Sequence, residues 1–327
     1  MTKQSDDRRI AVLSALRECE SCSGEALATS LGVSRVAVRK HVTALREMGY
    51  EIEARAGEGY RLTSTPDAPL PYEVAPLMRT AFYPRIDGKV RTGSTNDDAR
   101  ALALADAPEG TVVLAREQES GRGRLGRRWT SPAGGLYASI VLRPEVETPQ
   151  AIVLPLVVGV GTALGLESLG ADVRLKWPND LLAPDGRKIG GILCEGLSEG
   201  WRITWIVAGI GINVRHAPDE APCVCLDDLV GRRVPLATAA AALLDGIAEA
   251  YARWSRDGFD PLRADYERRS WLDGREVTVS DVHGGVLASG IASGIDATGR
   301  LIVETAEGPK AMLAGDVTLR EPTTREA

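Results

Sequence analysis

The sequence predicts a multidomain α/β protein in which a small helical unit and a small β unit flank a mixed central domain. Its 327 residues are too many for one small core and suit two or three domains. Helical periodicity dominates the start of the chain, strand-like and helix-like runs alternate in the middle, and short strands follow near the end. We expect domains at 1–65, 80–269 and 270–322, joined by a linker at 66–79.

The composition is that of an ordinary soluble globular protein, with 44% apolar and 26% charged residues. The net charge is −6, so any contact with DNA has to come from a local basic patch. The five cysteines are an odd number, and no secretory signal is recognised, which favours a reducing cytoplasm. Neither Cys19/Cys22 nor Cys223/Cys225 has histidines at zinc-site spacing, so we expect no structural metal.

The first domain is predicted to be a winged helix-turn-helix. Apolar spacing indicates a helix around residues 10–16, a short helix at 24–31 and a third helix at 35–48. A Gly-Val-Ser turn that ends in a good N-cap precedes the third helix. Alternating residues and a glycine turn indicate a hairpin at 50–62, which would be the wing.

The third helix carries the basic patch that DNA contact requires. Residues 35–47 hold four basic side chains and one acidic one, whereas residues 1–65 as a whole hold ten and nine. Arg46 is one of the basic residues expected on the exposed face. The expected DNA-binding residues are Ser34, Arg35, Arg39 and Lys40. The alternative is a solvated helix face on a dimerisation or scaffold domain.

The linker is rich in proline, and the central domain mixes both element types. Strands are predicted at 112–115, 136–142 and 205–212, and helices at 235–254 and 261–269. The last domain shows short strands that are separated by glycine and aspartate turns. These strands are predicted at 277–279, 286–291 and 301–303, and they suggest a small β-barrel.

One uncharged stretch of 19 residues, from Thr148 to Leu166, has nearly the length of a membrane-spanning helix. It contains two prolines and three glycines, and motif-rich soluble sequence lies on both sides. We therefore expect a buried core helix that begins near Ala151, and no membrane contact.

A glycine- and arginine-rich motif, Gly121–Trp129, is the first strong chemical signal. Its glycines let backbone amides turn toward an anion, and its four arginines can pair with phosphate or carboxylate. Trp129 offers a flat surface on which a base can stack. Alone, the motif indicates an anion-binding loop. A disordered RNA-binding tail is the alternative, but the motif occurs once, inside a folded region.

Three further motifs follow, each weak alone. Lys176–Asp180 (Lys-Trp-Pro-Asn-Asp) combines a lysine for phosphate with oxygen ligands suited to Mg²⁺. Arg187–Glu195 places a lysine before a glycine pair and an apolar strand, as suits a charge beside a small ligand. Gly209–Val214 is a strand whose glycines permit close approach and whose Asn213 can bond a nucleotide.

In this order and spacing, the motifs resemble those of the biotin–protein ligases. The matching patterns are Gly-Arg-Gly-Arg-x-Gly-Arg-x-Trp, Lys-Trp-Pro-Asn-Asp, Arg-Lys-x-x-Gly-Ile-Leu-x-Glu and Gly-x-Gly-Ile-Asn, preceded by Ser94-Thr95-Asn96. With the winged helix in front, the whole chain is similar to the bifunctional ligases that also repress a biotin operon. The resemblance implies a class II synthetase-like catalytic domain and an SH3-like C-terminal barrel.

The resemblance also implies a role for each matching residue. The biotin-binding residues would be Ser94, Thr95, Asn96, Gln118, Gly121, Arg122, Gly123, Arg124, Lys188 and Gly191. The ATP-binding residues would be Arg127, Trp129, Lys176, Asn179, Asp180 and Asn213, with Asp180 also a ligand of Mg²⁺. Lys188 and Arg124 would be catalytic, Lys188 by stabilising charge. Leu125 stands where some relatives carry arginine, and the sequence explains no role for Asp97 and Asp98.

The implied reaction uses biotin, ATP and Mg²⁺. The biotin carboxylate attacks the α-phosphorus of ATP, pyrophosphate leaves, and biotinyl-5′-AMP then passes biotin to a lysine on the carrier domain of a biotin-dependent carboxylase. Because both reactants are negative, cationic side chains and Mg²⁺ must offset their repulsion. We expect the Gly/Arg loop to close over the water-sensitive adenylate.

The other implied partners are operator DNA of biotin genes and a second copy of the chain in a ligand-promoted homodimer. Two alternatives stay open: a lipoate- or octanoate-type protein ligase, and a ligand-sensing regulator without ligase activity. The Gly-Arg-Gly-Arg pattern favours biotin, and retention of Lys188 and of the loop arginines favours an enzyme.

Overall fold

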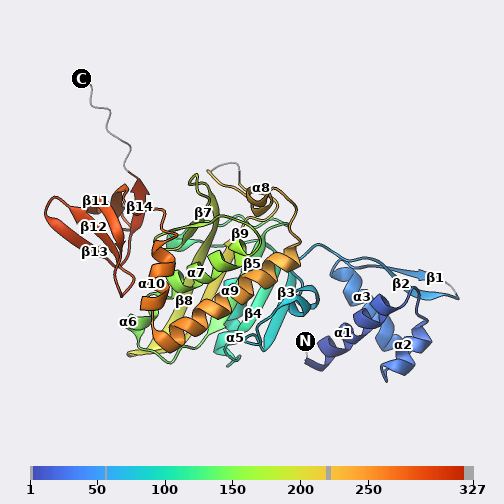
Figure 1. Ribbon diagram of the computed structural model, residues 1–327. Coiled ribbons are helices and arrows are strands. Elements are labelled where there is room, and N and C mark those ends of the chain that lie inside the picture. Colours follow the sequence, from blue (N-terminus) through green and yellow to red (C-terminus); the bar gives the residue numbers. More distant parts are fainter. Residues whose placement is uncertain (1–2, 56, 219–221, 320–327) are drawn as a thin grey trace. The chain divides into compact units, whose positions relative to one another are not determined.

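A computed structural model describes residues 3–55, 57–218 and 222–319. By its internal contacts the chain divides into two compact units, Met1–Asp67 and Ala68–Ala327. Figure 1 shows both units, with most of their helices and strands labelled.

The N-terminal unit has the predicted order of three helices and a hairpin. Its elements are α1 (Lys3–Glu18), α2 (Gly24–Ser30), α3 (Arg35–Glu47), β1 (Glu51–Arg55) and β2 (Gly59–Ser64). Each of the two later helices begins at a serine whose hydroxyl accepts a backbone hydrogen bond, as an N-cap does: Ser23 from Ala26 and Ser34 from Ala37. The apolar residues whose helical spacing predicted these helices form the core of this unit. Leu13, Leu16, Val38, Val42 and Leu45 are all buried.

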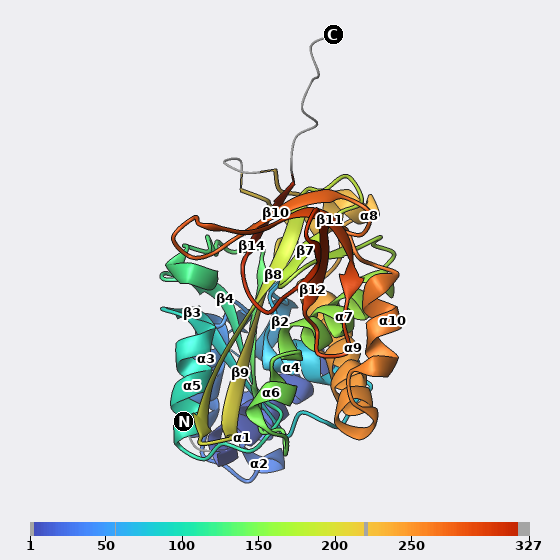
Figure 2. The same ribbon diagram turned by 90° about the vertical axis from the view of Figure 1, so that its left-hand side faces the viewer.

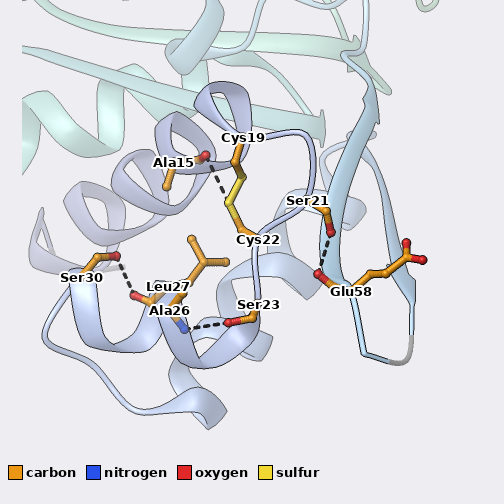
Figure 3. The surroundings of a disulfide bond; sticks show 9 residues. All are labelled: Ala15, Cys19, Ser21, Cys22, Ser23, Ala26, Leu27, Ser30 and Glu58. Carbon is orange, nitrogen blue, oxygen red and sulfur yellow. Dashed lines mark hydrogen bonds between the residues drawn. A yellow bond between two sulfur atoms is a disulfide. The ribbon is translucent and has the colours of Figure 1, made fainter.

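The turn between α1 and α2 is closed by a disulfide bond, Cys19–Cys22 (Figure 3). The sequence favoured a reducing cytoplasm, a compartment in which disulfide bonds are rare. The turn, however, brings the two Cα atoms to 6.1 Å, within the range that a disulfide spans. Cys22 and Tyr60 of β2 exchange two backbone hydrogen bonds of 2.8 Å. The hydroxyl of Ser21 donates to the carbonyl of Glu58 at 2.6 Å, so the α1–α2 turn is joined to the turn of the wing hairpin.

The second unit is built on a seven-stranded sheet. Its order is β3-β4-β5-β9-β8-β7-β6, and all described pairings are antiparallel except the parallel pair β3–β4. The strands are β3 (Arg85–Thr92), β4 (Thr111–Gln118), β5 (Leu136–Leu142), β6 (Arg174–Lys176), β7 (Asp180–Leu182), β8 (Lys188–Glu199) and β9 (Arg202–Ile212). The strands predicted at 112–115, 136–142 and 205–212 lie within β4, β5 and β9.

Helices cover both faces of this sheet. One face packs on α7 (Leu154–Glu167) and α9 (Leu236–Asp257) and forms the larger hydrophobic core. The other face is covered by α5 (Thr95–Leu104) and forms a smaller hydrophobic cluster (Figure 2). The shorter helices are α4 (Pro71–Val74), η1 (Ala75–Leu77), η2 (Arg124–Gly126), α6 (Thr148–Ala151), α8 (Leu226–Val230) and α10 (Asp260–Glu267). The helices predicted at 235–254 and 261–269 correspond to α9 and α10.

The uncharged stretch forms the short helix α6 and the buried core helix α7, which begins at Leu154 rather than near the predicted Ala151. The segment Thr148–Glu167 is apolar enough by length and composition to cross a membrane, but 72% of that window is buried inside the structure. A side chain on Gly161 would meet the Cα atom of Ile247 at 2.6 Å. Glycine at this position therefore lets α7 and α9 pack with their backbones in contact.

The C-terminal strands form a second sheet, ordered β13-β12-β11-β10-β14. They are β10 (Glu276–Ser280), β11 (Val286–Ile295), β12 (Leu301–Thr305), β13 (Gly308–Met312) and β14 (Asp316–Leu319). In hydrogen-bonding terms, the expected small barrel is thus a five-stranded antiparallel sheet with β13 and β14 at its edges. Its buried residues join the same hydrophobic core as α7 and α9, and the indole of Trp177 donates to Gly299 at 3.0 Å.

Candidate active site

The polar residues at the start of α5 are buried against the sheet. Ser94, Thr95 and Asn96 are each at most 6% exposed. Thr95 donates through its backbone amide and its hydroxyl to Gln118 at the end of β4, at 2.8 and 3.0 Å. Three of the predicted biotin-binding residues, Thr95, Asn96 and Gln118, therefore belong to one hydrogen-bonded cluster, and the buried Ser94 lies beside it as the N-cap of α5.

Ser139 is a member of this cluster that the motif analysis missed. It is fully buried in β5, and its hydroxyl lies 2.7 Å from Asn96 Oδ1 and 2.8 Å from Thr95 Oγ1. The signal was present in the sequence, since Ser139 is a hydroxyl in the middle of an otherwise apolar strand. A buried hydroxyl needs a hydrogen-bond partner, so such a residue points to a polar site. Ser131, which accepts from Gln118 at 2.9 Å, was missed as well.

The Gly/Arg motif forms a compact loop. Gly123 donates to the carbonyl of Arg127 at 2.7 Å, and Trp129 donates to that of Gly121 at 2.9 Å. At the tip, Leu125 and Gly126 have φ values of 57° and 71°. Leu125, which departs from the pattern of some relatives, therefore occupies a left-handed conformation that costs a leucine on the order of 1 kcal/mol.

Each of three loop arginines meets a partner from a distant part of the chain. Arg122 pairs with Asp97 at 2.6 Å. Arg124 lies 3.3 Å from Asn179 Oδ1 and 3.4 Å from the carbonyl of Gly315. Arg127 forms an ion pair with Asp316 of β14. The last two contacts bring the C-terminal sheet to the candidate site, which no local motif predicted.

Lys188 stands at the centre of the second group of predicted residues. Its Nζ atom lies 2.5 Å from Asp180 Oδ1 and 5.4 Å from the centroid of the Trp129 ring. Asp180 pairs in register with Gly191 and with Lys176. Burial lowers the pKa of Lys176, and the neighbouring Asp180 partly offsets this effect. A lysine, a carboxylate and an aromatic ring therefore share one site at the start of β8.

The two predicted asparagines are partly occupied within the protein. Asn179 donates to the carbonyl of Ile192 at 2.7 Å and keeps Oδ1 toward Arg124. Asn213 is buried, and its amide lies 3.5 Å from the carbonyls of Lys188 and Val224. In this structure Asn213 therefore holds the start of β8 to the chain before α8, and its nucleotide contact stays a prediction.

The predicted DNA-binding helix presents a basic face. Arg35, Arg39 and Lys40 are exposed on α3, and Ser34 is its N-cap. Arg46 is exposed as expected, and its guanidinium also donates twice to the carbonyl of Ile52, at 2.9 and 2.5 Å. Its guanidinium therefore anchors the wing.

Three family models match: the HTH domain over residues 8–61, the Biotin/lipoate A/B protein ligase family over 89–213, and the Biotin protein ligase C terminal domain over 274–320. The bifunctional ligase/repressor BirA of Bacillus subtilis (strain 168) is 34% identical, over 92% of this chain and 94% of the relative.

The chain belongs to the biotin protein ligase family. Another family member, the biotin–[acetyl-CoA-carboxylase] ligase of Paracoccus denitrificans, is 36% identical over 69% of this chain and 97% of that protein. The biotin protein ligase of Aquifex aeolicus, solved in complex with biotin and ATP, superposes with a TM-score of 0.61 at 29% identity. It covers 73% of this chain and 100% of the Aquifex chain.

Proposed function

We propose that this protein is an ATP-dependent biotin–protein ligase, a biotin–[acetyl-CoA-carboxylase] ligase. It forms biotinyl-5′-AMP and transfers biotin to a lysine on the carrier domain of a biotin-dependent carboxylase. The observation that carries the proposal is that two groups lie over neighbouring positions of β9, since a Cβ on Gly209 would meet Asn96 and a Cβ on Gly211 would meet Trp129. The buried amide and hydroxyl cluster around Asn96 can bind a small polar ring, and Lys188 beside Trp129 can bind an acidic tail and a nucleotide.

The charges of the site suit the reaction. The carboxylate oxygen of biotin forms a bond to the α-phosphorus while the bond to pyrophosphate breaks. Lys188, Lys176 and the loop arginines are cationic groups held near this point, and they stabilise negative charge as it develops. The amine of the acceptor lysine then attacks the acyl carbon, loses its proton, and AMP leaves.

Asn179 and Asp180 fit a Mg²⁺ ion that is held mainly by nucleotide phosphates. Asp180 offers Oδ1 beside Lys188, and Asn179 offers Oδ1 beside Arg124, so each oxygen already faces a cation. Among the described residues no group of three or more His, Cys, Asp or Glu is placed to hold a metal. The protein would therefore supply one or two oxygens, as is usual for Mg²⁺ at nucleotide sites. The ion would neutralise phosphate charge.

We also propose that the protein is a cytoplasmic, biotin-responsive repressor without a membrane partner. The helix-turn-helix domain and its exposed Arg35, Arg39 and Lys40 support binding to operator DNA. One such domain covers one half-site, so a ligand-promoted homodimer would raise the affinity for a two-part operator. Biotinyl-5′-AMP is the natural signal, because free carrier domain consumes it.

Exchange of radiolabelled pyrophosphate into ATP tests the ligase. We expect exchange that depends on biotin and Mg²⁺, followed by transfer to a carrier-domain fragment. Exchange that responds to lipoate or octanoate but not to biotin would replace the proposal with a different ligase. Absence of exchange with every acid would leave a ligand-sensing regulator.

A further inference from the structure

The first arginine of the Gly121–Trp129 loop is held by a pair of carboxylates outside the motif. Arg122 donates to both oxygens of Asp97, at 2.6 and 2.8 Å, and lies 3.5 Å from Glu195. Arg100 approaches the same two carboxylates, at 2.8 and 3.6 Å. Two acids and two arginines thus form a network between α5, the loop and β8. Its main hydrogen bond, from Arg122, holds the pKa of Asp97 below its usual range.

Glu195 links this network to the predicted biotin pocket. Its Oε2 atom accepts from Asn96 at 2.8 Å and is the atom that lies 3.5 Å from Arg122. Asn96 is itself buried, and its Oδ1 atom faces the Ser139 hydroxyl. One carboxylate therefore orients a buried pocket residue and contacts the loop at the same time.

Arg122 is the best anchored of the three loop arginines described above. Its pair with Asp97 is bidentate, and its side chain is two-thirds buried, with 33% exposed. Arg124 reaches the carbonyl of Gly315 only at 3.4 and 3.5 Å, and the Arg127 side chain is 63% exposed. Bidentate pairs of arginine and carboxylate add geometric specificity as well as energy, and they contribute more when the arginine is largely buried, as Arg122 is, than when it is exposed, as Arg127 is.

We infer that Asp97 is a positioning residue for the ligase reaction. Together with Glu195 it holds Arg122 in place, so that the first half of the loop is ordered before biotin arrives. We call these contacts of Arg122 with Asp97 and Glu195 the latch. The inference rests on the proposed ligase function. A pre-ordered loop loses less conformational freedom when ligand binds, so the latch acts on biotin affinity rather than on the chemical step. The Asp97 side chain is 49% exposed, and it has no part in the transfer.

Asp97→Asn tests the latch, with Asp98→Asn as the matched control. Asp98 lies in the same turn of α5 but accepts from the Thr92 hydroxyl, at 2.6 Å, rather than from the loop. We expect Asp97→Asn to raise the KM for biotin about threefold to tenfold in pyrophosphate exchange, with kcat within about twofold of the parent. Asp98→Asn should leave both constants unchanged. Equal KM values in the two variants, or a fall in kcat alone, would overturn the assignment.

A second measurement needs no ligand. Limited subtilisin digestion of the full-length, ligand-free chain should nick residues 121–129 about threefold to tenfold faster in Asp97→Asn than in Asp98→Asn. In an Arg122→Gln background, Asp97→Asn should add nothing, because the latch is already open. Additive effects in this cycle would show that Asp97 acts elsewhere. If the parent protein shows no biotin-dependent exchange, the ligase proposal fails, and the digestion still decides whether the latch exists.

Discussion

Replacing Gly209 by alanine is expected to weaken binding in the predicted biotin pocket and to leave the predicted nucleotide pocket unchanged. Gly209 lies in β9, and a Cβ atom there would stand 2.0 Å from Oδ1 of Asn96. Real Cβ atoms do not approach other heavy atoms within 3.0 Å, so the amide of Asn96 has to turn away. It would then give up its two shortest hydrogen bonds, with Glu195 at 2.8 Å and with Ser139 at 2.7 Å.

The size of the effect follows from these two contacts. A hydrogen bond of this kind contributes about 1 kcal/mol net, so their loss removes about 2 kcal/mol from the arrangement that is predicted to hold biotin. This corresponds to about a thirtyfold change in affinity, because about 1.4 kcal/mol is tenfold. We therefore expect Gly209→Ala to raise the KM for biotin about thirtyfold and to leave the KM for ATP within about twofold.

Gly211→Ala, two residues along the same strand, is the matched variant. Its Cβ atom would stand 2.6 Å from Nε1 of Trp129, so it should raise the KM for ATP instead. Pyrophosphate exchange with each substrate varied in turn measures both constants, and a thermal melt of each variant checks folding. An unchanged biotin KM in Gly209→Ala, or equal rises for biotin and ATP, would refute the placement of Asn96 in the biotin pocket.

Four further outcomes are expected. Lys188→Ala should lower the rate of adenylate formation about 10²- to 10³-fold with normal folding, since one preorganised charge is removed; single-turnover kinetics within twofold of the parent would exclude that role. Arg124→Gly should let adenylate escape and biotinylate unrelated proteins, which a biotin blot of added albumin detects. If the variant and the parent retain adenylate equally well, the loop does not close over it. Arg39→Ala should weaken operator binding in a gel-shift assay and leave pyrophosphate exchange intact, and unchanged binding would move the DNA face elsewhere. Reducing Cys19–Cys22 should lower the stability of the N-terminal unit by about 2 kcal/mol, the loop-closure value for four residues; an unchanged denaturation midpoint with reductant contradicts this.

Strongly apolar segments of the fold were predictable from the sequence, whereas the edge strands of the two sheets were harder to predict. The strand at 136–142 was predicted with the bounds of β5, because seven buried residues in a row leave a clear apolar run. β3 and β13 were missed, since edge strands carry polar side chains and glycine on their open sides. α5 was missed because its first turn, with Thr95 and Asn96, belongs to a motif that was read for chemistry rather than for helix formation.

The members of the candidate site were easier to predict than the contacts between them. Motif spacing identified Lys188 and Asp180, which lie close together in the chain and form an ion pair. Asp316, by contrast, meets Arg127 from 189 residues away. Such a contact depends on how the second sheet packs, and no local pattern encodes that packing. The same reason left Asp97 without an interpretation until its partner Arg122 was located in space.

The glycines of the motifs have a more specific use than close approach to a ligand. A Cβ atom on Gly121 would stand 2.5 Å from the hydroxyl of Ser131, a member of the polar cluster. Gly209 makes room in the same way for Asn96, and Gly211 for the indole of Trp129. In each case the missing side chain leaves space for a polar atom or an aromatic ring of the candidate site. The motifs therefore interlock sterically: Gly209 and Gly211 of one motif seat a residue of the Ser-Thr-Asn segment and a residue of the Gly/Arg loop. This explains why segments far apart in the sequence have to occur together for any one of them to indicate the chemistry.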